Sequence, residues 1–379
     1  MESATRNNRA AEPTTHRAYQ DHARYGISID PFPLAIPLRS SYPTVIEQTR
    51  VSPNSYSYAG QLANGIPLPT LPDIGGGVLT LPGSITTITI EDNFRRGYVQ
   101  SFNFTLQRQI GAGFVAQMGY VGSRSIRLTN RRDLNASSPG GGAAGRPYFT
   151  AFGRNVATTL HGPAYTWSKA IGYGQNNDSG LFFNTPSALE RNRSLLGFDR
   201  PHNLRLSSVY ELPFGQGKAW LREGVLSKAA GGWQINGIYS AYSGSPFSVG
   251  TSAASLNAPG NSQVADQVKE KVEMLGGTGP GQSWFDPLAF APVTAVRFGN
   301  AGLNSLRGPS FFSLDLGVFR NFAIREKIQL QFRAEAFNAT NTPHFNNPGT
   351  TVSSMVRNAD GSIRSLGGYT EITSAQADE

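Results

Sequence analysis

Polar and apolar residues alternate along residues 327–338, KIQLQFRAEAFN. Every second residue from Ile328 to Ala336 is apolar, and the positions between them carry charged or amide side chains. These polar positions are Gln329, Gln331, Arg333 and Glu335. A period of two over this length predicts a β-strand with one apolar face and one strongly polar face.

The same alternation recurs in five other segments. They are residues 98–109, 111–122, 202–214, 233–244 and 311–322. Each is about ten residues long, the length that lets a tilted strand cross a bilayer. In residues 311–322 and 327–338 we expect the even-numbered apolar side chains to face lipid. These are Leu314, Leu316, Ile328, Leu330 and Phe332.

The connections between the expected strands alternate in length. Short turns are expected at residues 110–113 and 321–326, and a medium link at 213–231 contains a possible short helix. Long loops are expected at roughly 122–162, 172–200 and 244–310. Short turns at one end and long loops at the other are typical of outer-membrane barrels.

Two further elements are expected inside the long loops. Residues 263–275 show helical spacing of Val264, Val268, Val272 and Leu275, which predicts a helix on the barrel rim. Strands at 113–121 and 163–171 would both run toward the long loops. A returning strand is then needed between them, and 147–160 is the stretch available for it.

Composition supports an all-β fold. The chain has 379 residues with 43 Gly, 24 Pro and 11% aromatic residues, a mixture that suits many strands joined by polar loops. It has no cysteine, which excludes disulfides and thiolate metal sites. We therefore expect an antiparallel transmembrane β-barrel portion, incomplete, with about ten strands and long extracellular loops.

Charge and motifs indicate no catalytic or nucleic-acid site. The net charge is +8, but no basic run gathers it on one segment, so no nucleic-acid partner is expected. The glycine-rich segments 140–145 and 276–283 lack the strand and helix that a nucleotide site requires. The five histidines show no metal-ligand spacing. We expect no enzyme activity, no metal and no cofactor.

The polar strand faces are the candidate functional feature. In a barrel wall they would face a wet lumen, and the expected lumen-facing residues are Arg205, Asp315, Gln329, Gln331, Arg333 and Glu335. The turn at 321–326 is expected to join its two flanking strands as an antiparallel hairpin. Charge favours a register of this hairpin that sets Asp315 opposite Arg333. The second choice sets Asp315 opposite Glu335, a like-charge pair.

Aromatic residues near the strand ends are expected to form the two girdles at the membrane surfaces. They are Phe311, Phe319, Phe322, Trp233, Tyr242 and Trp167.

Seven segments together resemble the Oar-like TonB-dependent outer-membrane receptors of the acidobacterial type. They are YVQSFNFTLQRQIGAGFVAQMGYVGSRS (98–125), YTWSKAI (165–171), FDRPHNLRLSSVYELPFG (198–215), GGWQINGIYSAYSGSPFSV (231–249), WFDPLAFAP (284–292), FGNAGLNSLRGPSFFSLDLGVFRNF (298–322) and LQFRAEAFNATNTPHFNNP (330–348). The resemblance covers roughly residues 95–375. It implies part of a barrel of about 22 strands with a plugged lumen. It also implies uptake of a small ligand, energised by a TonB complex acting on the plug.

The sequence departs from that family's pattern. A plug domain and a TonB box are not found, a strand and turn are missing near residue 160, and the last strand is expected to be absent. The resemblance therefore divides the chain into residues 1–94, the start of the barrel fragment with weak strands, and residues 95–379, the C-terminal part of the barrel. The expected partners are outer-membrane lipid and an unidentified small ligand, with TonB reached only through a plug.

Two other functions stay open from the sequence. One is a secreted or surface-associated structural or adhesive β-protein without transport activity. The other is a carbohydrate-active enzyme on a β-scaffold, which requires paired carboxylates in a cleft. The regularly placed strand acids, Asp315 and Glu335, are expected beside Arg205 and Arg333, which favours charge pairing over acid–base catalysis.

Overall fold

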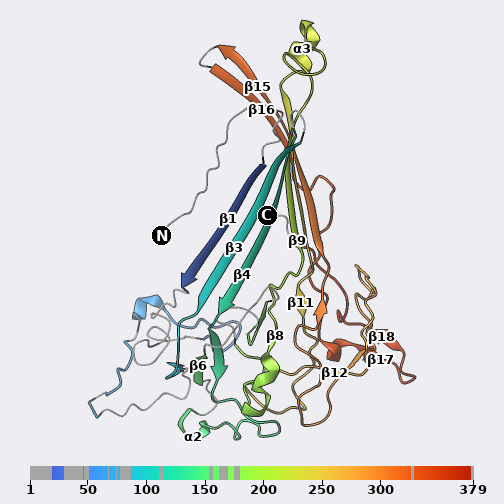
Figure 1. Cartoon of the computed structure of the whole chain (residues 1–379). Coiled ribbons are helices and arrows are strands. Elements are labelled where there is room, and N and C mark those ends of the chain that lie inside the picture. Colours follow the sequence, from blue (N-terminus) through green and yellow to red (C-terminus); the bar gives the residue numbers. More distant parts are fainter. Residues whose placement is uncertain are drawn as a thin grey trace.

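The structure is a computed structural model with two regions: a long twisted β-sheet and, at one end of it, a body of loops and short strands (Figure 1). It describes residues 19–29, 46, 51–66, 68–73, 75–76, 87–110, 114–127, 129–152, 157–161, 170–174, 180–325 and 328–376.

The main sheet contains seven described strands in the order β1-β3-β4-β9-β10-β15-β16. Their bounds are β1 (Tyr19–Ile29), β3 (Tyr98–Ile110), β4 (Phe114–Ile126), β9 (Asn203–Glu211), β10 (Trp233–Tyr242), β15 (Phe311–Arg325) and β16 (Ile328–Ala336). All neighbouring pairs are antiparallel. The order of these strands in the sheet is their order along the chain, so the topology is an up-and-down meander.

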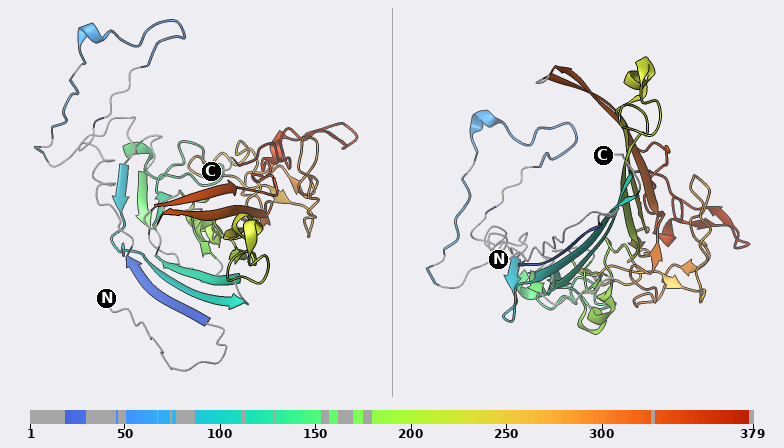
Figure 2. Two further views of the ribbon diagram at one scale, coloured as in Figure 1. Left: turned by 90° about the horizontal axis from the view of Figure 1, so that it is seen from above. Right: turned by 45° about the horizontal axis from the view of Figure 1, so that its top comes forward.

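The sheet is an open portion of a barrel wall. Figure 2 shows it as a curved layer whose edge strands, β1 and β16, do not meet. The all-β antiparallel class expected from the sequence is confirmed. Seven strands are fewer than the ten or so expected, within the part of the chain that the structure describes.

Connection lengths alternate as the sequence predicts. The links 111–113, 212–232 and 326–327 lie at one end of the sheet, and the links 30–97, 127–202 and 243–310 lie at the other. The medium link contains helix α3 (Gly224–Ala230), as expected. The end with the shorter links is called the turn end below.

The hairpin of β15 and β16 is confirmed, but its predicted turn and register are wrong. The strands continue to Arg325 and resume at Ile328, and Phe319 rather than Asp315 lies opposite Arg333. The apolar alternation continues through the expected turn, so pairing more residues satisfies more backbone hydrogen bonds. The pairing then shifts by four residues from the expected register.

Between β4 and β9 the predicted extra strand pair is not found in the main sheet. β4 pairs directly with β9. Of the expected returning strand at 147–160, residues 149–152 form the short helix α2 (Phe149–Phe152) and 157–160 belong to β6 (Ala157–His161). β6 lies in a separate sheet with β2 (Thr87–Ile90) and β5 (Asn130–Asp133). Most of the expected strand at 163–171 lies outside the described residues.

Register gives the main sheet two chemically distinct faces. The apolar face carries the odd-numbered residues of β1 and β10 and the even-numbered residues of the other five strands, and the polar face carries the rest. Large side chains on the apolar face are left exposed. They include Tyr25, Ile27, Phe104, Met118, Tyr120, Leu204, Leu206, Phe312, Leu316, Leu330 and Phe332. An exposed, mainly apolar surface of this extent marks a membrane or protein contact.

The compact core of the chain lies in the loops rather than in the sheet. We call residues 129–152, 180–202, 243–310 and 337–376 the loop cap. Its buried hydrophobic cluster comprises Phe183, Ala188, Phe247, Val249, Val264, Ala265, Phe285, Ala289, Phe290, Ala301, Val352 and Tyr369. These residues come from three loops, so burying them joins the loops into one packed body.

Short elements lie in the loop cap and, in the case of β7, in the segment just before one of its parts. They are β7 (Ile171–Gly172) with β8 (Ser194–Leu195), β11 (Pro246–Phe247) with β14 (Leu306–Arg307), β12 (Asp266–Gln267) with β13 (Phe290–Ala291), β17 (Val356–Arg357) with β18 (Ile363–Ser365), and the 3₁₀ turns η2 (Pro186–Asn192) and η3 (Val352–Ser354). A further 3₁₀ turn, η1 (Leu62–Asn64), lies in the N-terminal segment.

The helix predicted at 263–275 is wrong. Val264 is fully buried in the cap core and forms a β-bridge with Gly250, while Asp266–Gln267 is strand β12. Val268 and Leu275, which would share the helical face, are exposed. The spacing of four arises in an irregular segment whose conformation is set by contacts with distant residues, and branched valines favour extended backbone.

Candidate functional site

The candidate site is the polar face of the main sheet. Residues that pair across two antiparallel strands point to the same side, as do residues two apart on one strand. Arg205 pairs with Ser240, which pairs with Ser313. Through such pairs all six residues predicted from the sequence share one face. They are Arg205, Asp315, Gln329, Gln331, Arg333 and Glu335.

A row of hydrogen-bonding side chains crosses this face from strand to strand. Gln107 pairs with Gln117, and Gln117 pairs with Ser207. The row continues through Ile238 and reaches Asp315 on β15. Five neighbouring strands therefore contribute to one line, in which Ile238 is the single apolar side chain. Amides both donate and accept hydrogen bonds, so such a row suits contact with water or a hydrated solute.

The acidic and basic residues of β16 pair with each other. Arg333 and Glu335 form an ion pair on the same strand, and both side chains are partly exposed. The Arg333 guanidinium also lies 5.3 Å from the centre of the Phe319 ring, its partner across the hairpin. The predicted pairing of Arg333 with Asp315 is therefore replaced by a pairing within β16.

Asp315 is held by the chain that follows β16. Its Oδ1 accepts a hydrogen bond from the backbone N–H of Asn338 at 2.9 Å and one from Ser313 Oγ at 3.3 Å. These contacts fix the carboxylate where the wall meets the loop cap. Asp315 and Glu335 therefore take part in separate contacts, Asp315 with Ser313 and Asn338 and Glu335 with Arg333.

Arg205 is a cation of this face without an ion-pair partner among the described residues. Its Nε donates to Ser240 Oγ at 3.3 Å, and no carboxylate contacts it within the described ranges. The residue is exposed on β9. Its guanidinium is therefore available to a carboxylate or phosphate from outside the chain.

Aromatic side chains stack where the polar face meets the loop cap. The Tyr242 and Phe311 rings are parallel with centres 4.2 Å apart, and the His344 ring lies 4.0 Å from Phe311. The guanidinium of Arg200 lies 5.7 Å from the Tyr242 ring. His344 also contacts the carbonyl oxygen of Phe312 at 3.2 Å through Nε2. The stack joins the ends of two strands to the segments on either side of them.

The predicted aromatic girdles are only partly compatible with this register. Trp233 and Phe322 lie on the apolar face, as girdle residues require. Tyr242, Phe311 and Phe319 lie on the polar face, so their assignment to a girdle is wrong. A position near a strand end does not determine which face of the sheet a side chain lies on. An odd or even position along the strand does, because successive side chains alternate between the faces. Trp167 lies outside the described residues.

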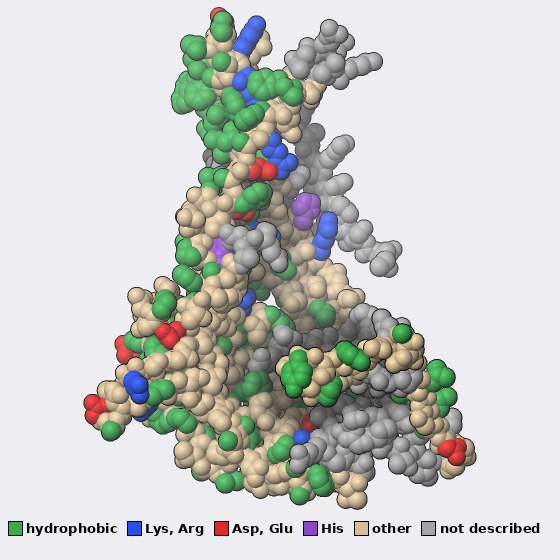
Figure 3. Space-filling view, turned by 180° about the vertical axis from the view of Figure 1, so that it is seen from behind, with side chains coloured by type: hydrophobic (Ala, Val, Ile, Leu, Met, Phe, Trp, Pro, Cys, Tyr) green, Lys and Arg blue, Asp and Glu red, His purple; other side chains and the backbone are tan. Residues whose placement is uncertain are grey.

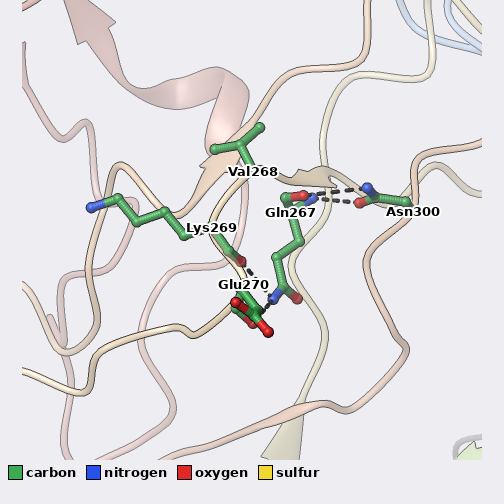
Figure 4. A pocket seen from close by; sticks show the side chains of 5 residues that line it. All are labelled: Gln267, Val268, Lys269, Glu270 and Asn300. Carbon is green, nitrogen blue, oxygen red and sulfur yellow. Dashed lines mark hydrogen bonds between the residues drawn. The ribbon is translucent and has the colours of Figure 1, made fainter.

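A shallow pocket of about 280 Å³ opens on the loop cap and is lined by Gln267, Val268, Lys269, Glu270 and Asn300 (Figure 4). Its polar groups largely bond to one another. The Gln267 side-chain amide donates to the backbone carbonyls of Lys269 and Glu270, and the Asn300 amide bonds the backbone of Gln267. These bonds fix the loop, and we assign the pocket no ligand. No cluster with metal-ligand composition occurs in the described part of the chain.

Beside this pocket, Asp266 and Arg297 form a two-pronged ion pair. Arg297 Nη1 and Nη2 donate to the two carboxylate oxygens at 2.8 and 2.7 Å, and Asn300 N donates to Oδ1 at 3.1 Å. The hydrogen bond from Arg297, and then that from Asn300, lower the pKa of Asp266 below its ordinary value although partial burial opposes this.

We expect the loop cap to lose stability in acid through this pair. The unfolded carboxyl takes up its proton first, so the stabilisation is complete above about pH 4 and declines as the pH falls toward the lowered pKa. Urea unfolding followed by Trp284 fluorescence between about pH 5 and 3 measures the decline. Asp266→Asn should reduce this pH dependence, whereas Glu270→Gln, a matched change at the pocket, should leave it intact. Equal pH dependence in the wild type and Asp266→Asn would contradict the assignment.

Comparison with known families matches the geometry of the sheet. The sequence model of the family described as "Outer membrane beta barrel domain" matches residues 22–163 and 157–377. The two stretches cover most of the chain. The chain belongs to the outer-membrane β-barrel domain family. No curated protein and no solved structure gives a significant match.

Family membership places this outer-membrane β-barrel in the outer membrane. It explains why large apolar side chains on one face of the main sheet have no protein cover, since hydrocarbon covers such a face in barrel proteins. Among the described helices, none has the length and hydrophobicity to span a bilayer.

Sequence reasoning missed the loop cap and the aromatic stack. The cap core joins residues more than 100 positions apart, such as Phe247 and Tyr369, and no local period signals this. The stack could have been found in part, because Tyr242 and Phe311 have the parity of the polar residues on their strands.

Proposed function

We propose that this outer-membrane β-barrel is the wall of a TonB-dependent receptor of the Oar-like type, which moves a small water-soluble ligand across the outer membrane. The proposed role is transport rather than catalysis. The observation that carries it is the division of the sheet into an exposed, mainly apolar face and an opposite face crossed by a row of hydrogen-bonding side chains. The seven sequence segments that resemble Oar-like receptors support the finer assignment.

In this proposal the polar face lines the path of the ligand. The row from Gln107 to Asp315 supplies hydrogen-bonding groups, and Arg205 supplies a cation without a carboxylate partner among the described residues. Such a surface suits a hydrated ligand with hydroxyl, amide or acidic groups. The aromatic stack of Tyr242, Phe311 and His344 lies at the cap end of this path.

The loop cap would form the outward-facing entrance. Long loops of outer-membrane barrels face the exterior, and short turns face the periplasm. The proposed energy source is a TonB complex of the inner membrane, which acts on such receptors through a plug domain. Outer-membrane lipid is the proposed partner of the apolar face.

Uptake by living cells tests the proposal. A strain lacking the gene and its complemented counterpart are offered radiolabelled oligosaccharides and peptides as probes. Complemented cells should accumulate at least one probe, and a protonophore that dissipates the inner-membrane gradient should reduce accumulation to the level of the deletion strain. Arg205→Ala should weaken accumulation of acidic probes more than that of neutral ones.

The same experiment separates transport from surface adhesion. Binding of a probe to the complemented cells without accumulation, and without an effect of the protonophore, would support a surface-associated adhesive protein instead. Accumulation that persists after protonophore addition would contradict the dependence on TonB.

A further inference from the structure

Exposed apolar side chains gather at the turn end of the molecule, in the link 212–232 between β9 and β10. Trp220, Leu221, Val225 and Leu226 are 61%, 44%, 83% and 67% exposed. We call these four residues the tip cluster. Figure 3 shows hydrophobic side chains concentrated at this end of the molecule, where α3 lies.

The structure fastens the link to the apolar face of the sheet. Arg320 Nη1 donates to the carbonyl oxygen of Ala229 at 2.5 Å and Nη2 donates to that of Lys228, while Trp233 Nε1 donates to Ala229 at 3.2 Å. Arg320 and Trp233 pair with each other on the apolar face, and Trp233 packs edge-on against Phe332. The C-terminal end of α3 is therefore attached to the side of the wall that faces lipid.

These contacts also indicate how deep in the bilayer the link lies. An arginine on the lipid-facing side is costly at mid-bilayer and tolerated near the surface. Arg320 directs its guanidinium to the carbonyls at the end of α3 and lies 5.3 Å from the Trp233 ring. A tryptophan and an arginine together at one level are typical of the membrane–water interface.

The charges of the link suit a phospholipid surface. It carries three basic side chains, Lys218, Arg222 and Lys228, against one acidic side chain, Glu223. Lys218 forms an ion pair with Glu211 on β9, and Arg222 and Lys228 are exposed. Exposed apolar groups flanked by long basic side chains are the pattern of segments that lie in the headgroup region.

We propose that the link 212–232 is an interfacial anchor that inserts its tip cluster into the periplasmic leaflet of the outer membrane. The inference rests on the proposed function in that the apolar face contacts hydrocarbon and the turn end faces the periplasm. Arg222 and Lys228 contact anionic headgroups, and the Trp220, Leu221, Val225 and Leu226 side chains reach the boundary between headgroups and acyl chains. The anchor fixes the turn end of the wall relative to the bilayer.

Site-directed spin labelling tests the proposal directly, because the chain has no cysteine to remove. Labels at Val225→Cys and Leu226→Cys are examined in vesicles of phosphatidylethanolamine and phosphatidylglycerol. Both should be several-fold more accessible to oxygen than to a water-soluble nickel chelate. The matched control is Val268→Cys on the loop cap, where Val268 is 59% exposed, and it should favour the nickel chelate.

A label at Leu316→Cys separates the anchor from the proposed function. If residue 316 reports lipid while residues 225 and 226 report water, the anchor is wrong and the wall assignment stands. If residue 316 also reports water, the lipid-facing wall fails with it. Strong spin–spin broadening at residue 225 that persists on dilution into excess lipid would show a second copy on the tip cluster and overturn the proposal.

A charge variant tests the headgroup contact. Replacing Lys218, Arg222 and Lys228 together with glutamine should remove any difference in immersion of the Val225→Cys label between anionic vesicles and phosphatidylcholine vesicles. Immersion that is equal in both lipids before the replacement would exclude the anionic contact.

Discussion

Replacing Leu316 with arginine should lower the free energy of unfolding in a bilayer by about 2–4 kcal/mol. Leu316 is the sixth residue of the 15-residue strand β15 and is 40% exposed on the apolar face. Its two cross-strand partners are Gly237, which has no side chain, and Ala336, which has only a methyl group, so neither partner covers it with a large side chain. An arginine there must enter the hydrocarbon or reach for the surface, and either distorts the bilayer.

Two comparisons make this result specific. Leu330→Arg should cost less, about 0–1 kcal/mol, because Leu330 lies near the turn end, where the charge reaches headgroups. Ser313→Arg, on the polar face beside Asp315, should also cost little. Denaturant unfolding in lipid vesicles gives the three free energies. Equal effects at Leu316 and Ser313 would show that the two faces meet the same solvent.

Replacing Phe285 with alanine should cost the loop cap about 3–5 kcal/mol. Its side chain is fully buried and lies at 5.6–6.0 Å, centre to centre, from three rings. These are Phe247, Phe290 and Tyr369. The substitution removes both buried apolar area and the packing between two separate loops, and the surrounding rings cannot collapse fully into the space.

Tyr369→Phe is the matched control for this core. The Tyr369 hydroxyl is buried without a hydrogen-bond partner in the described structure, and burial raises the pKa of the phenol. Removing an unsatisfied buried hydroxyl should be neutral or stabilising. Unfolding followed by Trp284 fluorescence measures both variants. A large loss in Tyr369→Phe, or a loss below about 1 kcal/mol in Phe285→Ala, would contradict the packing described here.

The strands of the wall were predictable because their signal is local. Alternation of Leu314, Leu316 and Val318 with polar neighbours identifies both the strand and its faces. The hairpin turn was placed too early because alternation alone does not say where pairing stops. The register then followed the turn, since in a hairpin the position of the turn fixes every partner.

The loop cap was not predictable because distant contacts determine it. Val264 and Val268 have helical spacing, yet one is buried in the cap core and the other is exposed. Val264 belongs to a cluster built from segments far apart in sequence, and that cluster sets the local backbone. The polar residues of the candidate site that lie on strands are therefore predictable from the sequence. The contacts that the loops contribute to the site are not.

The number of strands in the sheet constrains any structure that closes it. Each of the seven strands is antiparallel to its neighbour, so the edge strands β1 and β16 run in the same direction. Pairing these two edges directly would create one parallel seam in an otherwise antiparallel wall. A closed barrel in which every pair of neighbours is antiparallel needs an even number of strands. An odd number of strands must therefore fill the gap between β1 and β16 to close such a barrel.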